Sequence, residues 1–189
     1  MPEVILDAPT GTGKSVIAMW VSWILKELGN AGYMVTSDLT LQDQYQRDFV
    51  RLGLRWPSIK GVDNYDCHIN GLKFSLGECR MRNMGYERAM KLPCASNCSY
   101  LQIRKRAIDH PVCLLNYSFW LVHRNYVAPK LENEGKQIPF DRRDFAIFDE
   151  AHRVDEIVQS HFSPRIEKTL ATVINNQIDF LRKRGLPFP

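Results

Sequence analysis

The chain has 189 residues, of which 44% are hydrophobic and 24% are charged, and its formal net charge is +4. This composition is ordinary for a globular protein, and the length suits one domain with a sizeable core or one domain with an insertion. No apolar run is as long as the roughly 18 residues that cross a membrane, so we expect no membrane partner. The N-terminus has no secretory pattern, so we expect an intracellular protein of the cytoplasm or nucleoid, or a virus-encoded one.

The first expected elements are a short strand at residues 3–7 and a helix at residues 14–28, joined by a glycine-containing loop. The loop has the residue types of a phosphate-binding loop, with alanine where the first glycine of the pattern usually lies. Its glycines let backbone N–H groups turn toward the phosphates of ATP, its lysine adds a positive charge, and its serine offers a hydroxyl to Mg²⁺. The candidate ATP-binding residues are Ala8, Pro9, Thr10, Gly11, Thr12, Gly13, Lys14 and Ser15.

A second strand is expected at residues 33–37, followed by a helix at residues 40–52 with Thr40 as its N-cap. Residues 56–97 are irregular and rich in Cys, Gly, Arg and Met, apart from a short helix expected at residues 86–91. Loop-rich composition of this kind indicates an insertion between regular elements.

The irregular stretch contains cysteines that can bind a metal. Because disulfides are disfavoured inside cells, the five cysteines of the chain need another role. Cys113 lies in an apolar run and is expected to be a core residue. The others are separated by eleven, fourteen and three residues and can hold a [4Fe–4S] cluster or Zn²⁺. Their loose spacing favours a cluster over the paired short spacings of a zinc site, with zinc and no metal as alternatives. These four are Cys67, Cys79, Cys94 and Cys98.

Positive charge is concentrated around the same cysteines. Between Cys67 and Arg106, eight basic residues are opposed only by Glu78 and Glu87, so this segment carries +6 and the rest of the chain −2. Such a cluster suits the phosphate backbone of a nucleic acid, although a solvated surface has the same composition. The basic residues are Lys73, Arg80, Arg82, Arg88, Lys91, Arg104, Lys105 and Arg106.

The second half of the chain alternates strands and helices. We expect a helix at residues 99–108, a strand at 112–116, a helix at 118–123, a polar mobile loop at 128–143, a strand at 145–149, and helices at 150–160 and 166–182. This alternation favours a parallel sheet with ligand sites at the carboxyl ends of its strands.

Acidic residues follow the last expected strand, which we expect to be buried. Asp149 is suited to hold Mg²⁺ through water, and Glu150 to polarise the attacking water as a general base. His152 would relay the state of the nucleotide to a bound strand of nucleic acid. A polar helix start has similar composition, but the phosphate loop upstream favours catalysis. The candidate catalytic residues are therefore Lys14, Asp149, Glu150 and His152.

Taken in order, these motifs resemble those of the XPD/DinG-like superfamily 2 helicases. Residues 8–15 resemble motif I, residues 36–44 (TSDLTLQDQ) resemble motif Ia, and residues 149–152 (DEAH) match the DEAH box. Residues 98–104 (CSYLQIR) are similar to the stretch around the last cluster cysteine of the family, and residues 114–118 (LLNYS) to the strand and turn before motif II. The resemblance spans nearly the whole chain.

The resemblance implies an α/β fold, the RecA-like parallel sheet of a P-loop NTPase flanked by helices, with an inserted iron–sulfur domain and the start of a helical arch insertion. Residues 1–55 and 111–160 would form the ATP-binding domain, 56–110 the iron–sulfur domain and 161–189 the start of the arch. It also implies that the four cysteines of the insertion hold a [4Fe–4S] cluster, with Zn²⁺ as the runner-up.

The family implies ATP-driven translocation on single-stranded or forked DNA, usually 5′ to 3′, with unwinding of the duplex. The residues expected to contact DNA are Ser37, Thr40, Lys73, Arg80, Arg82 and Arg88. Tyr65, Phe74 and Tyr86 either stack on bases or pack in the core, and core packing is slightly favoured.

No part of the sequence resembles the second motor domain of the family or its adenine-contacting segment. Hydrolysis in such motors needs charge stabilisation from the second lobe, so we expect a fragment or split gene product of a longer helicase, or a chain that acts with a partner carrying the other half. Exposed apolar surface is expected where that lobe docks. The alternative function is a non-catalytic nucleic-acid-binding module with a structural zinc or cluster site and a vestigial nucleotide site.

Overall fold

A computed structural model describes residues 3–9, 11–82 and 84–162 of the chain. The chain divides into two compact units, Met1–Ile157 and Val158–Pro189, and the first contains the sheet, the phosphate loop and the cysteine-rich segment. The helix predicted at residues 166–182 lies outside the described residues. The predicted arch, residues 161–189, also lies outside them, except for its first two residues, which are the last two of α8 (Val154–Phe162).

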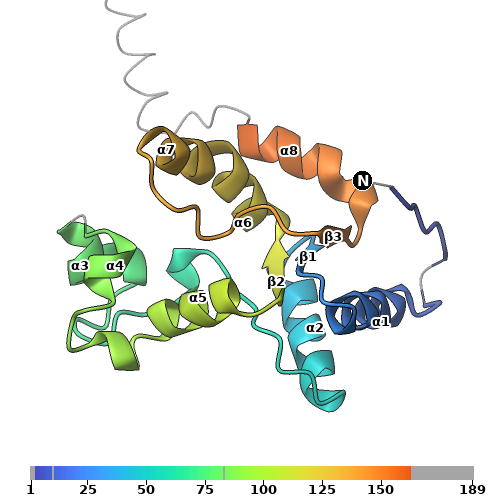
Figure 1. Ribbon diagram of the computed structural model, residues 1–189, viewed down its shortest axis with the longest axis horizontal. Helices are drawn as coiled ribbons and strands as arrows, with labels where there is room; N and C mark the ends of the chain where they lie inside the picture. The colour runs from blue at the N-terminus through green and yellow to red at the C-terminus, as the bar shows by residue number, and fades with distance from the viewer. Residues whose placement is uncertain (1–2, 10, 83, 163–189) are drawn as a thin grey trace, which may run out of the picture. The chain divides into compact units, whose positions relative to one another are not determined.

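The first unit contains a parallel sheet of three strands (Figure 1). β1 (Gly32–Thr36) lies between β2 (Val112–Asn116) and β3 (Phe145–Phe148). In the register of the sheet, Met34 of β1 lies opposite Leu114 of β2 and Ile147 of β3. All three strands lie within one residue of their predicted bounds, and the predicted α/β fold, a RecA-like parallel sheet flanked by helices, is confirmed.

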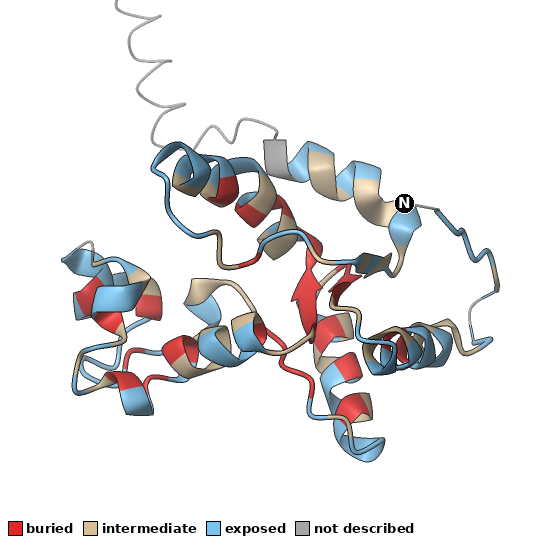
Figure 2. Cartoon of the chain, viewed as in Figure 1, coloured by how far each residue is buried: buried red, intermediate tan, exposed pale blue. Residues whose placement is uncertain are grey.

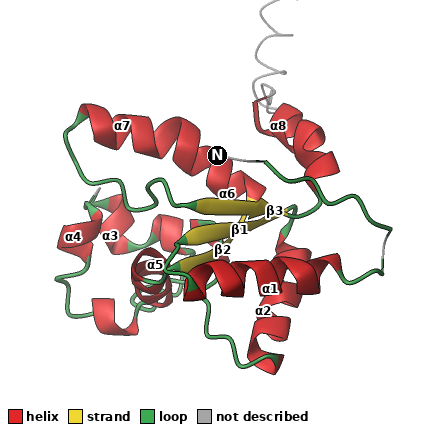
Figure 3. Cartoon of the chain, turned by 45° about the vertical axis from the view of Figure 1, so that its right-hand side comes forward, coloured by secondary structure: helices red, strands yellow, loops and turns green. Residues whose placement is uncertain are grey.

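Helices cover both faces of this sheet (Figure 3). α1 (Lys14–Glu27) and α2 (Leu39–Arg51) pack on one face, where the loop after α2 adds a tryptophan to the core. α6 (Tyr117–Val122) lies on the other face, and α5 (Ser99–Asp109) contributes to the core on that face. Helices on both faces bury β1 and β2 on either side, as is usual for parallel strands.

The strands alternate their side chains between two cores. In β1, Met34 packs with Met19 of α1 and Phe49 of α2, whereas Tyr33 and Val35 pack on the opposite face. Every residue of β1 and β2 is buried, as the red strands of Figure 2 show. β3 is different: it lies at the edge of the sheet and alternate residues are exposed. The expectation of a buried strand before the acidic segment is therefore wrong.

The cysteine-rich segment consists of short helical turns joined by loops. It begins beside the sheet, where Ile59 N donates to the Leu114 carbonyl oxygen at 3.1 Å and Leu114 N donates to the Pro57 carbonyl oxygen at 2.9 Å. The predicted short helix near residue 86 is confirmed as α4. The turns are η1 (Val62–Asn64), η2 (Phe74–Leu76), α3 (Glu78–Met81), α4 (Tyr86–Ala89) and η3 (Ala95–Asn97).

The helical segment that begins with α6 continues beyond residue 123, the predicted end of the helix. A π-helical turn, η4 (His123–Val127), connects it to α7 (Ala128–Asn133). The mobile loop predicted at residues 128–143 is therefore wrong for its first six residues. Its polar composition suggested a loop, but polar side chains also suit the exposed side of a helix, and Ala128 on the inner side is buried.

The strand predicted at residues 3–7 is also wrong. These residues form no strand with the described sheet, and the side chains of Val4 and Ile5 are 91% and 92% exposed. Their apolar, β-branched composition suggested a strand, but a strand also needs a neighbour for its backbone hydrogen bonds. The phosphate loop thus follows an unpaired segment.

α1 is covered on one side only. Met19 and Ser22 are buried, whereas Trp20 and Trp23 stay 54% and 39% exposed and pack edge to face on each other. The helix therefore presents apolar surface to solvent over most of its length. The other exposed apolar side chains on or next to it are Val16, Ile17, Val21, Ile24 and Leu28.

Candidate functional site

The phosphate loop ends at the N-terminus of α1. Gly11 and Gly13 have backbone φ angles of +87° and +84°, a left-handed conformation that favours glycine. Lys14 turns back over the loop, and its Nζ donates to the Ala8 carbonyl oxygen at 2.7 Å. The loop backbone thus has the conformation for which the sequence supplies glycines, and the lysine is held by the loop itself.

The remaining loop residues complete this turn. Thr12 Oγ1 donates to the Pro9 carbonyl oxygen at 2.8 Å, which closes the loop on itself. Ser15 lies in the first turn of α1 and is half-buried. Thr10 lies outside the described residues.

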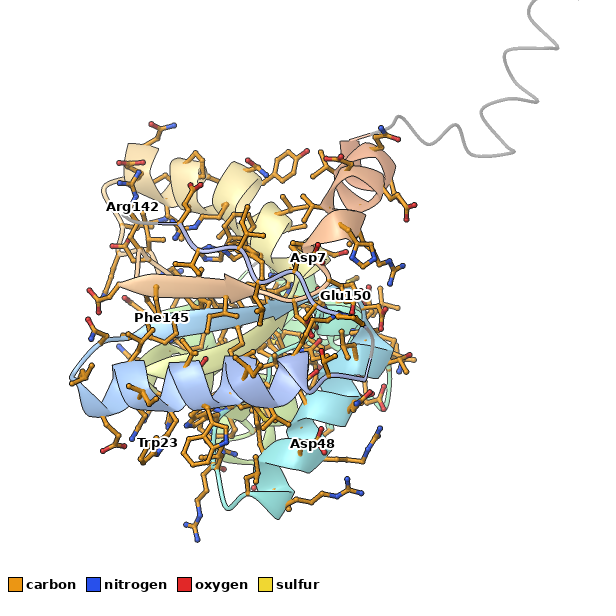
Figure 4. All side chains as sticks on the ribbon, turned by 90° about the vertical axis from the view of Figure 1, so that its right-hand side faces the viewer. Asp7, Trp23, Asp48, Arg142, Phe145 and Glu150 are labelled. Carbon is orange, nitrogen blue, oxygen red and sulfur yellow. The ribbon has the colours of Figure 1, made fainter. Side chains whose placement is uncertain are left out.

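The DEAH segment, which we name for the sequence of residues 149–152, follows β3 at the carboxyl end of the sheet. Asp149 N donates to the Val35 carbonyl oxygen at 2.9 Å, and one Asp149 carboxylate oxygen accepts from Glu150 N at 3.0 Å. Glu150 has a φ of +55°, the only positive value among the described residues other than glycine. His152 Nε2 lies 3.3 Å from Glu150 Oε2 in the following turn, η5 (Ala151–Arg153). In Figure 4, Glu150 and Arg142 lie at opposite ends of the sheet.

The phosphate loop and the DEAH segment meet at Tyr45 of α2. The Tyr45 hydroxyl donates to Asp149 Oδ2 at 2.8 Å, and the Ser15 side chain lies next to it. Burial raises the pKa of Tyr45, and the neighbouring carboxylates of Asp149 and Glu150 raise it further. Tyr117 anchors the same segment from α6, because its hydroxyl donates to the Asp149 carbonyl oxygen at 3.2 Å.

Sequence reasoning missed Tyr45. Its spacing of four residues from Leu41 and from Phe49 could have placed it on the inner face of α2. That spacing gives no information about the group that its hydroxyl meets, because Asp149 is more than a hundred residues away in the sequence.

The segment resembling motif Ia lies beside the DEAH segment. Arg153, a second residue that sequence reasoning missed, donates through Nη1 to Ser37 Oγ at 3.1 Å and to Asp38 Oδ2 at 2.9 Å. The N-cap of α2 is Asp38 rather than the predicted Thr40, because Asp38 Oδ1 accepts from Leu41 N at 2.9 Å. This backbone hydrogen bond, with Ser37 and Arg153, lowers the pKa of Asp38. Ser37 is buried and Thr40 is exposed, so only Thr40 of this pair faces solvent.

All four cysteines of the irregular segment line one cavity of about 250 Å³. They come from separate turns and loops, and the cavity walls are mostly apolar, with Phe74, Leu92 and Leu101 among them. Three of the four are buried, Cys94 is half-buried, and every cysteine of the chain is a free thiol. Within the described ranges, no three His, Cys, Asp or Glu side chains are close enough together to hold a single metal ion.

Cys113 is separate from this cavity. It is fully buried in β2, where burial raises the pKa of its thiol to about 12. The prediction of a small core residue is confirmed.

The basic residues predicted to bind DNA are exposed. Lys73 and Arg82 each form an ion pair with an acidic neighbour, at 2.8 and 3.2 Å. Among the described residues, Arg80 and Arg88 have no carboxylate within ion-pair distance. These two guanidinium groups are therefore the better placed of the four to meet a phosphate.

The aromatic residues of the same segment are packed within it. Phe74 is 2% exposed and lies against Tyr100 with ring centroids 4.4 Å apart, and the Tyr65 ring is 5.3 Å from the same tyrosine. Arg104 covers the ring of Tyr86 at 4.3 Å. Core packing, the favoured interpretation from sequence, is confirmed for Phe74.

A RecA-like parallel sheet with a phosphate loop before its first helix defines a class of protein, the ATP-binding motor domains of helicase type. The comparison with protein families agrees with this class. The model of the family described as "Type III restriction enzyme, res subunit" matches residues 2–177, and the chain belongs to this family. The chain is therefore an ATP-binding, helicase-type motor domain, a kind of domain that binds nucleic acid. No curated protein matches the sequence significantly.

A search for membrane spans among the described helices found none with the length and apolar character to cross a bilayer.

Proposed function

We propose that this chain is the ATP-binding half of a DNA helicase, which binds single-stranded DNA and couples ATP hydrolysis to 5′-to-3′ translocation and unwinding. The observation that carries the proposal is the meeting of Ser15 and Asp149 at one buried hydroxyl, that of Tyr45. A hydroxyl from a phosphate loop and a carboxylate at the end of a neighbouring strand are the pair that a motor of this class uses to hold Mg²⁺ with ATP.

The residues of this site suit a nucleotide with its metal. Backbone N–H groups of the loop around Gly11 and Gly13 would face the phosphates, and Lys14 would exchange the Ala8 carbonyl oxygen for a phosphate oxygen. Ser15 and Asp149 offer oxygen ligands, the type that Mg²⁺ prefers. When bound, Mg²⁺ would neutralise charge on the phosphates.

In this proposal Glu150 acts on the attacking water, and His152 relays the state of the nucleotide to a bound strand of DNA. The Glu150 carboxylate accepts a proton from water in the proposed reaction, which makes the water a better nucleophile. His152 Nε2, 3.3 Å from that carboxylate, orients it and connects it to the adjoining turn. The left-handed backbone of Glu150 supports a functional role, because strain of this kind persists mainly where a site requires it.

The proposal also requires a second motor domain, which would stabilise the charge that develops during ATP hydrolysis. That domain, in the same or a separate polypeptide, would supply the positive charge that phosphoryl transfer needs. The exposed tryptophans of α1, Trp20 and Trp23, support a missing partner surface, because large apolar side chains rarely stay exposed without one.

Single-stranded or forked DNA is the proposed partner. Thr40 at the exposed start of α2 and the exposed guanidinium groups of Arg80 and Arg88 are available for phosphate contacts. Ser37, Lys73 and Arg82 belong to the same proposed surface after release of their present partners, Arg153 and two carboxylates.

We also propose a [4Fe–4S] cluster on the four cysteines of the cavity. A zinc ion takes its four ligands at about 2.3 Å from a single point, whereas a cluster of four irons separates its cysteine ligands around a larger body. The support for this proposal is that four thiols from separate turns line one mostly apolar cavity. In this proposal residues 56–110 are an inserted domain, residues 1–55 and 111–160 form the motor domain, and residues 161–189 begin an arch.

One observation favours the alternative, a nucleic-acid-binding module with a vestigial nucleotide site. The segment before the phosphate loop lies outside the sheet, with Val4 and Ile5 almost fully exposed. The test is fluorescence anisotropy of one preparation with labelled single-stranded DNA and, separately, with a fluorescent ATP analogue and Mg²⁺. The helicase proposal predicts that both bind. Binding of DNA alone would support the module, and binding of neither would contradict both.

A further inference from the structure

We propose that Tyr45 is a positioning residue, whose hydroxyl holds the Asp149 carboxylate and the Ser15 hydroxyl in the arrangement that receives Mg²⁺. This inference rests on the proposed nucleotide site and assigns the control of its geometry to α2. The hydroxyl that lies between Ser15 and Asp149 belongs to α2, and neither the phosphate loop nor the DEAH segment supplies it.

The Tyr45 hydroxyl touches both proposed metal ligands. It donates to Asp149 Oδ2 at 2.8 Å, and the Ser15 side chain lies next to it. The other oxygen of the same carboxylate accepts from Glu150 N at 3.0 Å. Both oxygens of Asp149 are therefore fixed, one by its own backbone turn and the other by α2, and the plane of the carboxylate is defined before a metal binds.

Tyr45 itself is held rigidly. It is 1% exposed, and its ring lies 6.1 Å from that of Phe49, which packs against Trp56 at 5.1 Å. One turn earlier, the buried Gln42 side chain donates to Ser58 Oγ and to the Ile59 carbonyl oxygen, both at 2.9 Å. α2 therefore cannot rotate about its axis without breaking buried contacts, so the position of the hydroxyl is set by the core.

The backbone that carries Asp149 is fixed as well. Its N–H bonds to the Val35 carbonyl oxygen at 2.9 Å, and its carbonyl oxygen accepts from the Tyr117 hydroxyl at 3.2 Å. With the main chain held in this way, the remaining freedom of Asp149 is the rotation of its side chain. The hydrogen bond from Tyr45 restricts that rotation.

The hydroxyl of Tyr45 acts as a permanent donor. A tyrosine phenol has an ordinary pKa of about 10 and so keeps its proton at physiological pH. A donor of this kind orients a carboxylate without competing with a cation for its charge, as the outer hydrogen-bond partners of metal ligands generally do.

The test compares Tyr45→Phe with Tyr33→Phe in the full chain. Each variant removes one buried hydroxyl and keeps the ring, and Tyr33 donates to the Asp141 carbonyl oxygen at 2.9 Å, at the opposite end of the sheet from Asp149. The measurement is binding of a fluorescent ATP analogue as a function of Mg²⁺ concentration, with a parallel titration in EDTA. Loss of an outer partner of a metal ligand typically weakens metal affinity by about tenfold or more.

We expect Tyr45→Phe to raise the half-saturating Mg²⁺ concentration by about tenfold and to leave binding in EDTA unchanged, while Tyr33→Phe matches the parent chain. An unchanged Mg²⁺ dependence in Tyr45→Phe would overturn the role of Tyr45 and leave the nucleotide site intact. Equal shifts in both variants would also overturn it, because a general loss of stability would then explain them. If the parent chain binds no nucleotide at all, the proposed function fails first and this inference fails with it.

Discussion

Glu150 combines an uncommon backbone conformation with the carboxylate that we assign to the attacking water. Its φ of +55° puts the residue in the left-handed region, and its carboxylate faces His152 at 3.3 Å. Residues held in such conformations cluster at active sites. The proposed chemistry would therefore depend on one carboxylate that is held on a left-handed backbone.

Glu150→Gln should separate nucleotide binding from hydrolysis. The amide keeps the size of the side chain but cannot accept the proton of the water, so we expect unchanged nucleotide affinity and a loss of DNA-stimulated ATP turnover of about a hundredfold or more. Phosphate release in the presence of single-stranded DNA measures the turnover. Glu156→Gln, at an exposed position of α8, is the matched control and should hydrolyse ATP like the parent. Turnover by Glu150→Gln at the parent rate would remove Glu150 from the mechanism.

His123 makes the stability of the domain depend on pH. Burial, together with the nearby guanidinium groups of Arg104 and Arg124, lowers its pKa to about 4. The ring packs against Phe140 with centroids 5.1 Å apart, and its buried Nε2 has no hydrogen-bond partner among the described residues. Since the unfolded chain has a His pKa near 6.5, it binds more protons than the folded chain between these two values. The contribution of His123 to stability is therefore present above pH 6.5 and is lost as the pH falls toward 4.

Replacing His123 with Phe should remove this dependence. The shift corresponds to at most about 3 kcal/mol between pH 6.5 and 4, and Phe keeps the ring while removing the buried nitrogen that lacks a partner. Urea unfolding at pH 7 and pH 5 gives the free energy of unfolding of both chains. We expect the parent to lose more stability than the variant over this interval. Equal losses in the two chains would show that His123 does not titrate on unfolding.

At the level of helices and strands, Arg143 connects the end of α5 to the starts of β1 and β2. Its guanidinium lies over the ring of Tyr33 at 4.4 Å. The same group donates at 2.9 to 3.2 Å to four carbonyl oxygens, those of Gly32, Ala107, Ile108 and Pro111. A planar group with several fixed donors can satisfy the end of α5 and the edge of the sheet at once, which a single ammonium cannot do.

Arg143→Lys should therefore be costly although it conserves charge. We expect a loss of about 2–3 kcal/mol in the free energy of unfolding, because buried carbonyl groups lose their donors. Arg142→Lys is the control one residue earlier, at an exposed position, and should change stability by less than about 0.5 kcal/mol. Chemical denaturation of both variants measures the difference. Similar stabilities for the two would show that the four hydrogen bonds contribute little.

At the level of helices and strands, only part of this fold could be predicted from the sequence. β1, β2, α1 and α2 were predictable because each has its own apolar pattern, and parallel strands between helices must be buried. The segment at residues 3–7 has an equally suitable pattern but no partner in the sheet, and strand formation depends on that partner. α7 was missed because its polar residues cover a single buried alanine, Ala128.

The residues of the candidate site could also be predicted only in part. The residue types and spacing of the glycines, the lysine and the carboxylates were enough to propose the phosphate loop and the DEAH segment from sequence. Tyr45 and Arg153 were not, since their partners, Asp149 and Asp38, lie more than a hundred residues away and are fixed only by packing of the sheet. Residues that link two motifs can therefore be identified only once the structure is known.

At the scale of the whole molecule, the cysteine cavity gives the sharpest chemical prediction. Anaerobic purification followed by iron, sulfide and zinc analysis should give about four irons per chain and a coloured protein. Cys79→Ser, in the cavity wall, should lose the iron, whereas Cys113→Ala, in β2, should keep it. One zinc per chain without iron or sulfide would contradict the cluster and leave the motor proposal unaffected.

The central claim, that this chain is an ATP-binding motor domain, is tested most directly by calorimetric titration of ATP with Mg²⁺ into the parent chain, Lys14→Ala and Lys26→Ala. Both lysines lie on α1, but Lys14 belongs to the phosphate loop, whereas Lys26 pairs with Glu27 near the other end of the helix. We predict saturable binding to the parent and to Lys26→Ala, and no measurable binding to Lys14→Ala. Absence of binding to the parent, or equal binding to all three chains, would contradict the account.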